Sequence, residues 1–279
     1  MTSIIIPAHN EQAVVARCIE SLKSDAGADS YQVILVANGC SDRTAEVSRR
    51  VWDRIDVIET DIPSKSNALN LGDAKATGFP RFYMDADITL SPSAISIISS
   101  LMAETGALAA APTMEMRFPN TSWPVRAYYR VWQRLPYVEE GMIGVGIYAL
   151  SEEGRRRFDR FPSIIADDGY IRRLFKPHER LRVEECRSVV TAPGSLWGLI
   201  KIKTRSRLGG YELSEKFPEL SQNEPKGYAR AVWGLVRRPA LWPALMVYTG
   251  VNLIARLRAT KMHRWRAHGV WERDDTSRR

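Results

Sequence analysis

The chain is poor in cysteine, and the few that it has form no recognisable cluster. It contains 3 cysteines and 4 histidines in 279 residues, without a Cys-x-x-Cys pair and without paired Cys and His at the spacing of zinc ligands. A fold held by disulfides and a structural zinc site are therefore not expected. We expect reduced thiols in a cytoplasmic protein.

Long hydrophobic runs are also missing. The apolar run near the start is only Ile4–Ile6, too short for a signal-peptide core, so we expect no export signal. The longest stretch without Asp, Glu, Lys or Arg, residues 239–255, has 17 residues and includes Pro243 and Gly250. Because a spanning helix needs about 20 mostly apolar residues, a simple transmembrane helix is not expected.

Positive charge is concentrated at the C-terminal end. Residues 201–279 contain 17 Lys and Arg against 7 Asp and Glu, a balance of +10, and since the whole chain carries +8, residues 1–200 balance at −2. Basic residues flank the run 239–255, and Trp242 and Trp265 lie near its ends. This pattern is expected of a helix at an anionic membrane surface, although a core helix or a dimer contact would also explain it.

Short β-branched runs alternate with helical periodicity in the first part of the chain. Strands are predicted at 3–6, 33–36, 56–58, 82–84 and 107–111, and helices after an N-cap at Asn10 and at 43–53, 65–76 and 92–104. This order predicts an α/β fold with a mainly parallel sheet flanked by helices, which binds ligands beyond the carboxyl ends of its strands. Later helices are expected near 125–134, from about Asp168, and over 226–258, with a turn-rich apolar segment at 141–150.

Polar clusters follow three of these strands. Residues 7–11 read Pro-Ala-His-Asn-Glu, residues 38–44 read Asn-Gly-Cys-Ser-Asp-Arg-Thr, and Asp85-Ala86-Asp87 follows the fourth strand. One or two carboxylates at a strand end suit Mg²⁺ or Mn²⁺, which prefer oxygen ligands and keep water or substrate phosphates in their shell. The register of these clusters predicts a divalent metal site at one edge of the sheet.

A fourth motif follows the third predicted strand and consists of Lys65, Asn67-Ala68-Leu69-Asn70 and Gly72. Together, the four motifs resemble, in order and spacing, those of the inverting family 2 glycosyltransferases over residues 1–112. The resemblance implies a GT-A (Rossmann-like) fold with a helical C-terminal extension. It also implies transfer of a sugar from a UDP- or GDP-sugar to a hydroxyl acceptor, for which a glycan or a lipid-linked molecule is a candidate, with Mg²⁺ or Mn²⁺.

The same resemblance implies roles for individual residues. Asn38 stands where the family usually has an Asp that contacts the base, so base recognition can differ here. The implied metal ligands are Asp87, the more direct one, and Asp85. The implied nucleotide-sugar-binding residues are Pro7, Ala8, Asn10, Glu11, Asn38, Lys65 and Asp85.

A second acidic pair, Asp167-Asp168, opens a predicted helix. Inversion needs a base that deprotonates the acceptor hydroxyl, and a carboxylate at a helix start gains from the dipole there. The pair resembles the family's base motif, and the helix register favours Asp168 as the base, with Asp167 as the alternative. If Asp168 is the base, Asp167 can cap the helix.

Two later segments are ambiguous. Residues 141–146 lack the full dinucleotide-binding glycine spacing and resemble the family's acceptor-side loop, unless they form an ordinary turn. The cationic run 201–207 resembles the family's basic motif that closes over the pyrophosphate, which makes Arg205 and Arg207 candidate ligands, unless the run is a solvated face.

These inferences divide the chain into a nucleotide-sugar-binding half (1–112), a half that binds the acceptor and supplies the base (113–212), and a basic helical extension (213–279). Two alternatives are a sugar nucleotidyltransferase and a non-catalytic nucleotide or nucleic-acid binding protein. The four predicted site aspartates would repel a phosphate backbone, so no nucleic-acid partner is expected. We expect a location in the cytoplasm, with the inner face of the membrane as a further site.

Overall fold

The structure is a computed structural model that describes residues 1–23, 31–135, 138, 141–142, 144–223 and 233–265. The chain forms two compact units. Unit 1 comprises Met1–Glu115, Gly144–Ser163 and Phe175–Val190, and unit 2 comprises Met116–Ile143, Ile164–Leu174 and Thr191–Arg279. The functional division at residues 112 and 212 stays a prediction.

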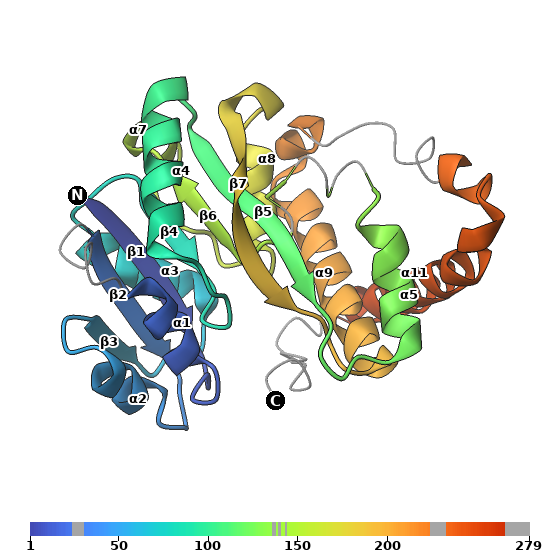
Figure 1. The fold of residues 1–279 in the computed structure, drawn as a ribbon, viewed down its shortest axis with the longest axis horizontal. Coiled ribbons are helices and arrows are strands. Elements are labelled where there is room, and N and C mark those ends of the chain that lie inside the picture. Colours follow the sequence, from blue (N-terminus) through green and yellow to red (C-terminus); the bar gives the residue numbers. More distant parts are fainter. Residues whose placement is uncertain (24–30, 136–137, 139–140, 143, 224–232, 266–279) are drawn as a thin grey trace. The chain divides into compact units, whose positions relative to one another are not determined.

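Unit 1 is built on a seven-stranded sheet with the strand order β3-β2-β1-β4-β6-β5-β7 (Figure 1). The pairs β1–β2, β2–β3 and β1–β4 are parallel, whereas β6 runs antiparallel to β4 and β5. The predicted α/β class with a mainly parallel sheet is confirmed. The strands are β1 (Thr2–Ala8), β2 (Tyr31–Asn38), β3 (Asp56–Thr60), β4 (Arg81–Met84), β5 (Ala109–Arg117), β6 (Ile147–Leu150) and β7 (Arg180–Thr191).

The helices of unit 1 follow the predicted alternation. They are α1 (Val15–Leu22), α2 (Thr44–Val51), α3 (Lys65–Lys75), α4 (Pro92–Thr105) and the short α7 (Glu152–Arg155). Helix α4 begins as predicted, with the Ser91 side chain accepting a hydrogen bond from the backbone N–H of Ala94. The predicted N-cap at Asn10 is wrong, because Val14 occupies the cap of α1 and Asn10 has a φ of 53°.

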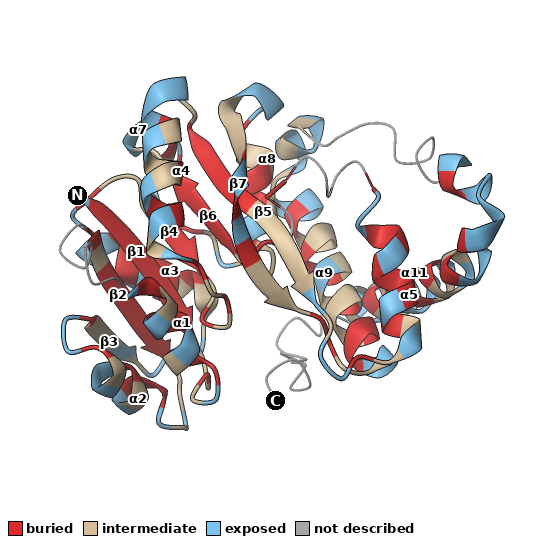
Figure 2. Cartoon of the chain, in the orientation of Figure 1, coloured by how far each residue is buried: buried red, intermediate tan, exposed pale blue. Residues whose placement is uncertain are grey.

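The core of unit 1 lies along its central strands. Every residue of β1 is buried, and Figure 2 shows this strand and β2 as nearly continuous buried ribbons. Ile5 and Ile6 have no exposed surface, as expected for strands covered on both faces. Helix α3 packs closely on β1 and β2 because Gly72 has no side chain; a Cβ atom there would lie 2.5 Å from Ile5 Cγ2.

Unit 2 is helical. Its main helices are α5 (Trp123–Trp132), α8 (Asp167–Leu174), α9 (Leu196–Lys216) and α11 (Trp242–Arg264). Helix α11 packs against both α5 and α9, and the rings of Tyr128 and Tyr248 lie 5.0 Å apart between α5 and α11. The helices predicted near 125–134 and 168 are confirmed, and a C-terminal helical region is present. Part of the predicted helix over 226–258 falls on residues 224–232, outside the described residues.

Candidate active site

The parallel pairing of unit 1 gathers the first polar clusters at one edge of the sheet. Ala8 is paired with Ala37, and Asn38 is paired with Thr60, so β1, β2 and β3 end at nearly the same level. The loops that follow these strands therefore emerge together at the carboxyl edge, where open α/β sheets bind ligands.

Asn38 joins the ends of β1 and β2. The residue is 3% exposed, and its side-chain amide nitrogen donates a hydrogen bond of 2.8 Å to the carbonyl oxygen of Ala8. Nδ1 of His9, the residue after β1, lies 2.6 Å from the carbonyl oxygen of Asn38, the last residue of β2, so a second contact joins the two strand ends. An aspartate, the usual family residue, has no N–H to donate to Ala8, so the asparagine fits this buried position better.

A second network fixes the loops after β1 and β2. The hydroxyl of Thr44 accepts a hydrogen bond from the backbone N–H of Glu11 at 2.8 Å and donates to Asp42 at 2.5 Å. The other carboxylate oxygen of Asp42 accepts from the backbone N–H of Gln12 at 3.0 Å. The sequence motif did not indicate these roles of Asp42 and Thr44, although an Asp commonly accepts a hydrogen bond from the backbone N–H two residues on, as Asp42 does from Thr44.

The structure brings two predicted donor-binding residues into contact. Lys65, the first residue of α3, forms an ion pair of 2.7 Å with Asp85, the residue after β4; their side chains are 22% and 41% exposed. The backbone N–H of Asp85 donates to the carbonyl oxygen of Gly146 at 2.8 Å. Gly146 has a φ of 67°, and a Cβ atom there would lie 2.5 Å from the Ile88 side chain, so a glycine is required beside this turn.

Asp85 and Asp87 are both partly exposed at the end of β4, and their chemistry fits part of a Mg²⁺ or Mn²⁺ shell. Within the described residues, no group of three His, Cys, Asp or Glu side chains could hold a metal by itself. Two carboxylates therefore suit a cation that takes its remaining ligands from substrate phosphates and water. Burial, followed by the nearby Asp87 and Asp85, raises the pKa of the Cys18 thiol, whose Sγ lies 4.0 Å from the carbonyl oxygen of Asp85.

The second acidic pair lies in unit 2. Asp167 is the first residue of α8 and is 5% exposed, whereas Asp168 is exposed and accepts a hydrogen bond of 2.7 Å from the backbone N–H of Gly169. Helix α9 holds the segment before this pair, since Glu212 accepts from the backbone N–H of Ile165 at 2.8 Å. Of the two carboxylates, only that of Asp168 is open to a substrate. Its role as the base stays a prediction.

The cationic run 201–207 lies inside α9. Arg207 donates a hydrogen bond of 2.8 Å to Asn252 of α11, and Arg205 is partly exposed. In the glycine-rich segment 141–146, residue 143 lies outside the described residues, while Gly144 and Gly146 have positive φ angles. The predicted pyrophosphate and acceptor contacts of these two segments stay predictions.

Residues 3–176, more than half of the chain, match the family model of Glycosyl transferase family 2. The chain belongs to glycosyl transferase family 2. Among curated relatives of this family 2 transferase, the glycosyltransferase AglE of Haloferax volcanii is 26% identical over 131 residues. That alignment covers 45% of this chain and 43% of AglE, so the match spans less than half of the relative's length.

Solved structures confirm the GT-A-like fold of this family 2 transferase. Mannosyltransferase PcManGT from Pyrobaculum calidifontis superimposes with a TM-score of 0.68 at 17% identity, covering 95% of this chain and 87% of that one. Glucosyl-3-phosphoglycerate synthase from Mycobacterium tuberculosis gives a TM-score of 0.56 at 17% identity, covering 77% and 78%. At these identities the likeness establishes the fold.

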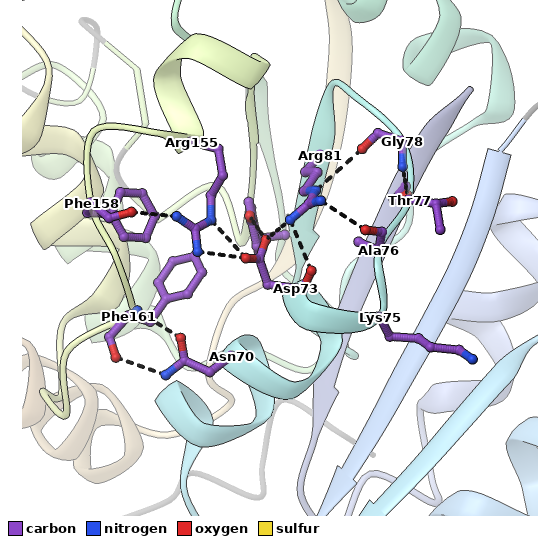
Figure 3. Close-up of polar contacts among 12 residues, drawn as sticks. Asn70, Asp73, Lys75, Ala76, Thr77, Gly78, Arg81, Arg155, Phe158 and Phe161 are labelled. Carbon is purple, nitrogen blue, oxygen red and sulfur yellow. Dashed lines mark hydrogen bonds and ion pairs between the residues drawn. The ribbon is translucent and has the colours of Figure 1, made fainter.

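In this family 2 chain, a buried ionic cluster holds the C-terminal half of α3 (Figure 3). Asp73 accepts hydrogen bonds from Tyr83 at 2.6 Å, Arg81 at 2.7 Å and Arg155 at 2.8 Å. Burial acts to raise the pKa of Asp73, but the three donors outweigh it, so the pKa lies below its usual value. This cluster, absent from our sequence-based predictions, fixes the helix that begins with Lys65.

One turn earlier in α3, the side-chain amide of Asn70 forms hydrogen bonds with the backbone N–H and the carbonyl oxygen of Phe161. Its Nδ2 donates to the Phe161 carbonyl oxygen at 3.0 Å, and its Oδ1 accepts from the Phe161 N–H at 2.8 Å (Figure 3). The sequence indicated Asn70 only as part of the resemblance. In the structure it attaches α3 to the chain segment after α7.

Proposed function

We propose that this family 2 transferase moves a sugar from a UDP- or GDP-sugar to a hydroxyl acceptor with inversion, using Mg²⁺ or Mn²⁺. The observation that carries the proposal is the Lys65–Asp85 ion pair of 2.7 Å, with Asp87 two residues further on, at the carboxyl edge of a parallel sheet. The donor class is supported by two structures of similar fold, one solved with GDP-Man and Mn²⁺ and one with UDP and Mn²⁺.

The residues at this edge suit a diphosphate that leaves as an anion. The backbone of Pro7 and Ala8, together with Glu11, would contact the nucleotide, as the family resemblance implies; all three residues are buried. Lys65 supplies a positive charge, and Asp85 holds its ammonium in place. A divalent cation held by Asp87 and Asp85 would neutralise the charge that develops on the leaving diphosphate.

Asp168 is the proposed base for the acceptor. Its exposed carboxylate would take the proton of the acceptor hydroxyl as that oxygen attacks the anomeric carbon from the face opposite the leaving group. The Gly169 N–H donates to Asp168 Oδ1 at 2.7 Å, which orients this carboxylate in the first turn of α8. Asp167, at 5% exposure, is the less suitable candidate.

The test separates donor binding from chemistry. A panel of UDP- and GDP-sugars is screened with Mn²⁺ for thermal stabilisation of the protein and for release of nucleoside diphosphate. Asp87→Asn should lose the Mn²⁺-dependent stabilisation and lower turnover by about a hundredfold or more. Asp168→Asn should keep the stabilisation and lower turnover by about a hundredfold.

Asp53→Asn provides a matched control, because Asp53 is an exposed carboxylate that precedes β3 and so lies at the opposite edge of the sheet. It should leave both readouts unchanged. Undiminished metal-dependent stabilisation and turnover in Asp87→Asn would refute the metal assignment. Release of pyrophosphate instead of nucleoside diphosphate would identify a nucleotidyltransferase, and salt-sensitive binding to DNA or RNA without turnover would identify a binding protein.

A further inference from the structure

Helix α11 has one face that is packed and one that is not. Its packed face contacts α5 and α9 in unit 2 and consists of small or buried residues, namely Ala244, Tyr248, Val251, Ala255 and Ala259. The opposite face carries large apolar side chains that are mostly exposed, namely Trp242 (55%), Met246 (77%), Leu253 (56%) and Leu257 (65%). Figure 2 shows exposed and buried positions alternating along this helix.

The spacing of the exposed residues makes a continuous stripe. Positions 242, 246, 253 and 257 are separated by four, seven and four residues, which places them on one side of an α-helix. Scattered apolar residues on a surface need no explanation, but an aligned stripe of four large ones indicates a contact with another apolar phase or molecule.

The charges of α11 indicate which phase it contacts. From Trp242 to Arg264 the helix contains no Asp or Glu, and its last three turns carry Arg256, Arg258, Lys261 and Arg264. Trp265 follows directly and is 79% exposed, so an exposed tryptophan stands at each end of the helix. An apolar stripe with cations beside it and tryptophans at its ends matches the interface of an anionic bilayer.

The packed face distinguishes a helix that lies on a membrane from one that crosses it. By length and composition Pro239–Arg264 could span a bilayer, and 28% of its apolar window is buried. A helix that crosses a bilayer alone is surrounded by lipid, whereas α11 packs its alanine-rich face against α5 and α9, and Arg207 of α9 donates to Asn252 within it. The surface of α11 that is available to lipid is therefore the outward one, with Ile254, 44% exposed, beside the stripe.

A second copy of the chain fits this surface less well. A two-fold interface brings the same patch of both copies together. In a parallel pair the basic C-terminal halves of α11 would face each other, and in an antiparallel pair each would approach Arg237 and Arg238 before the other helix. Like charges placed across an interface disfavour association. We therefore propose that α11 lies in the plane of an anionic bilayer surface, with Trp242, Met246, Leu253 and Leu257 in the lipid and its exposed cations at the headgroups.

Vesicle co-sedimentation of the full chain tests this proposal. The chain should bind phosphatidylcholine vesicles that contain phosphatidylglycerol, bind pure phosphatidylcholine vesicles much more weakly, and be released as NaCl is raised to about 0.5 M, where surface charges are screened. Met246→Glu with Leu257→Glu should weaken binding to the anionic vesicles by about tenfold or more, because two apolar side chains are withdrawn. Arg256→Glu with Lys261→Glu should abolish the preference for anionic lipid.

Ile62→Glu is the matched control, since Ile62 in unit 1 is 55% exposed, as Trp242 is, and lies outside α11. It should bind vesicles like the unmodified chain. Circular dichroism melting of each variant checks that α11 still packs. Equal vesicle binding by Met246→Glu/Leu257→Glu and the unmodified chain would overturn the proposal. A dimer in light scattering that this variant loses, without vesicle binding by either protein, would assign the stripe to a second copy instead.

The result is independent of the proposed sugar transfer. Donor turnover is measured without vesicles, so failure of either proposal leaves the other readout intact.

Discussion

The sharpest stability test concerns Asp73, the buried carboxylate at the centre of the cluster in Figure 3. Asp73→Asn keeps the size of the side chain but removes its charge and replaces one acceptor oxygen by a donor. Arg81 and Arg155 donate to this carboxylate at 2.7 and 2.8 Å, and all three side chains are at least 86% buried. After the substitution, two buried guanidinium groups would share a neutral partner.

The expected magnitude follows from that burial. Removing one partner of a buried ion pair typically costs about 3–5 kcal/mol, because the remaining charge stays buried without compensation. Glu59→Gln is the control, since Glu59 and Arg49 form an ion pair of 2.6 Å whose side chains are 59% and 51% exposed. Exposed pairs of this kind contribute about 0–1 kcal/mol. At about 2–4 °C per kcal/mol for a chain of this size, Asp73→Asn should lower Tm by about 6 °C or more.

Thermal melts over a pH series add a second readout. The pKa of Asp73 lies below its ordinary value, so its ionised form stabilises the folded state above about pH 4, and this contribution is lost as the pH falls through the lowered folded pKa. The Tm gap between the unmodified chain and Asp73→Asn should be constant near neutral pH and narrow in acid. A neutral-pH loss no greater than that of Glu59→Gln would refute the reasoning.

Four further substitutions test other positions by their melting temperatures. In the unmodified chain, the free energy of unfolding should rise as the pH increases from 7 to 10. Burial and Arg207 lower the pKa of Lys203 to about 7 in the folded state, so in this range only the unfolded chain holds the proton. Lys203→Met should remove this rise; the same pH dependence of Tm in both proteins would contradict this. Gly72→Ala should cost about 1–3 kcal/mol by overpacking, whereas Gly210→Ala, with open space around its Cβ, should stabilise by about 0.5–1 kcal/mol. Asn38→Asp should destabilise by about 1–3 kcal/mol near pH 8 and less near pH 5, where the acid can donate to Ala8; an unchanged Tm would show that Asn38 does not join the strands.

The N-terminal half of the fold could be predicted because its signals are local. Ile4–Ile6 and 33–36 are continuous apolar runs, and such runs form strands when both faces are covered. The parallel order then fixes where each strand ends, so the polar residues after β1, β2 and β4 could be assigned to one edge before any coordinates were known. The Lys65–Asp85 contact follows from that topology.

Strands β6 and β7 could not be predicted by the same means. Residues 147–150 read Ile-Tyr-Ala-Leu, too short a run to tell a strand from a turn-rich segment, and their pairing with β4 depends on partners more than 60 residues away. In β7, charged residues such as Arg182, Glu184 and Glu185 hide the alternation. The formation of these two strands depends on long-range pairing, which local sequence periodicity does not reveal.

The hardest features to predict are the hydrogen bonds that motif residues form within the fold, in addition to any contact with a ligand. Resemblance places Asn38 in a base-contacting position, yet its side-chain amide donates a hydrogen bond to the Ala8 carbonyl oxygen. Asn70, which belongs to another of these motifs, donates a hydrogen bond to the backbone of Phe161. A motif records which residue stands at a position but not which of its atoms are already bonded. Family resemblance therefore predicts the edge of the sheet at which chemistry occurs better than it predicts which side chains there remain available to a substrate.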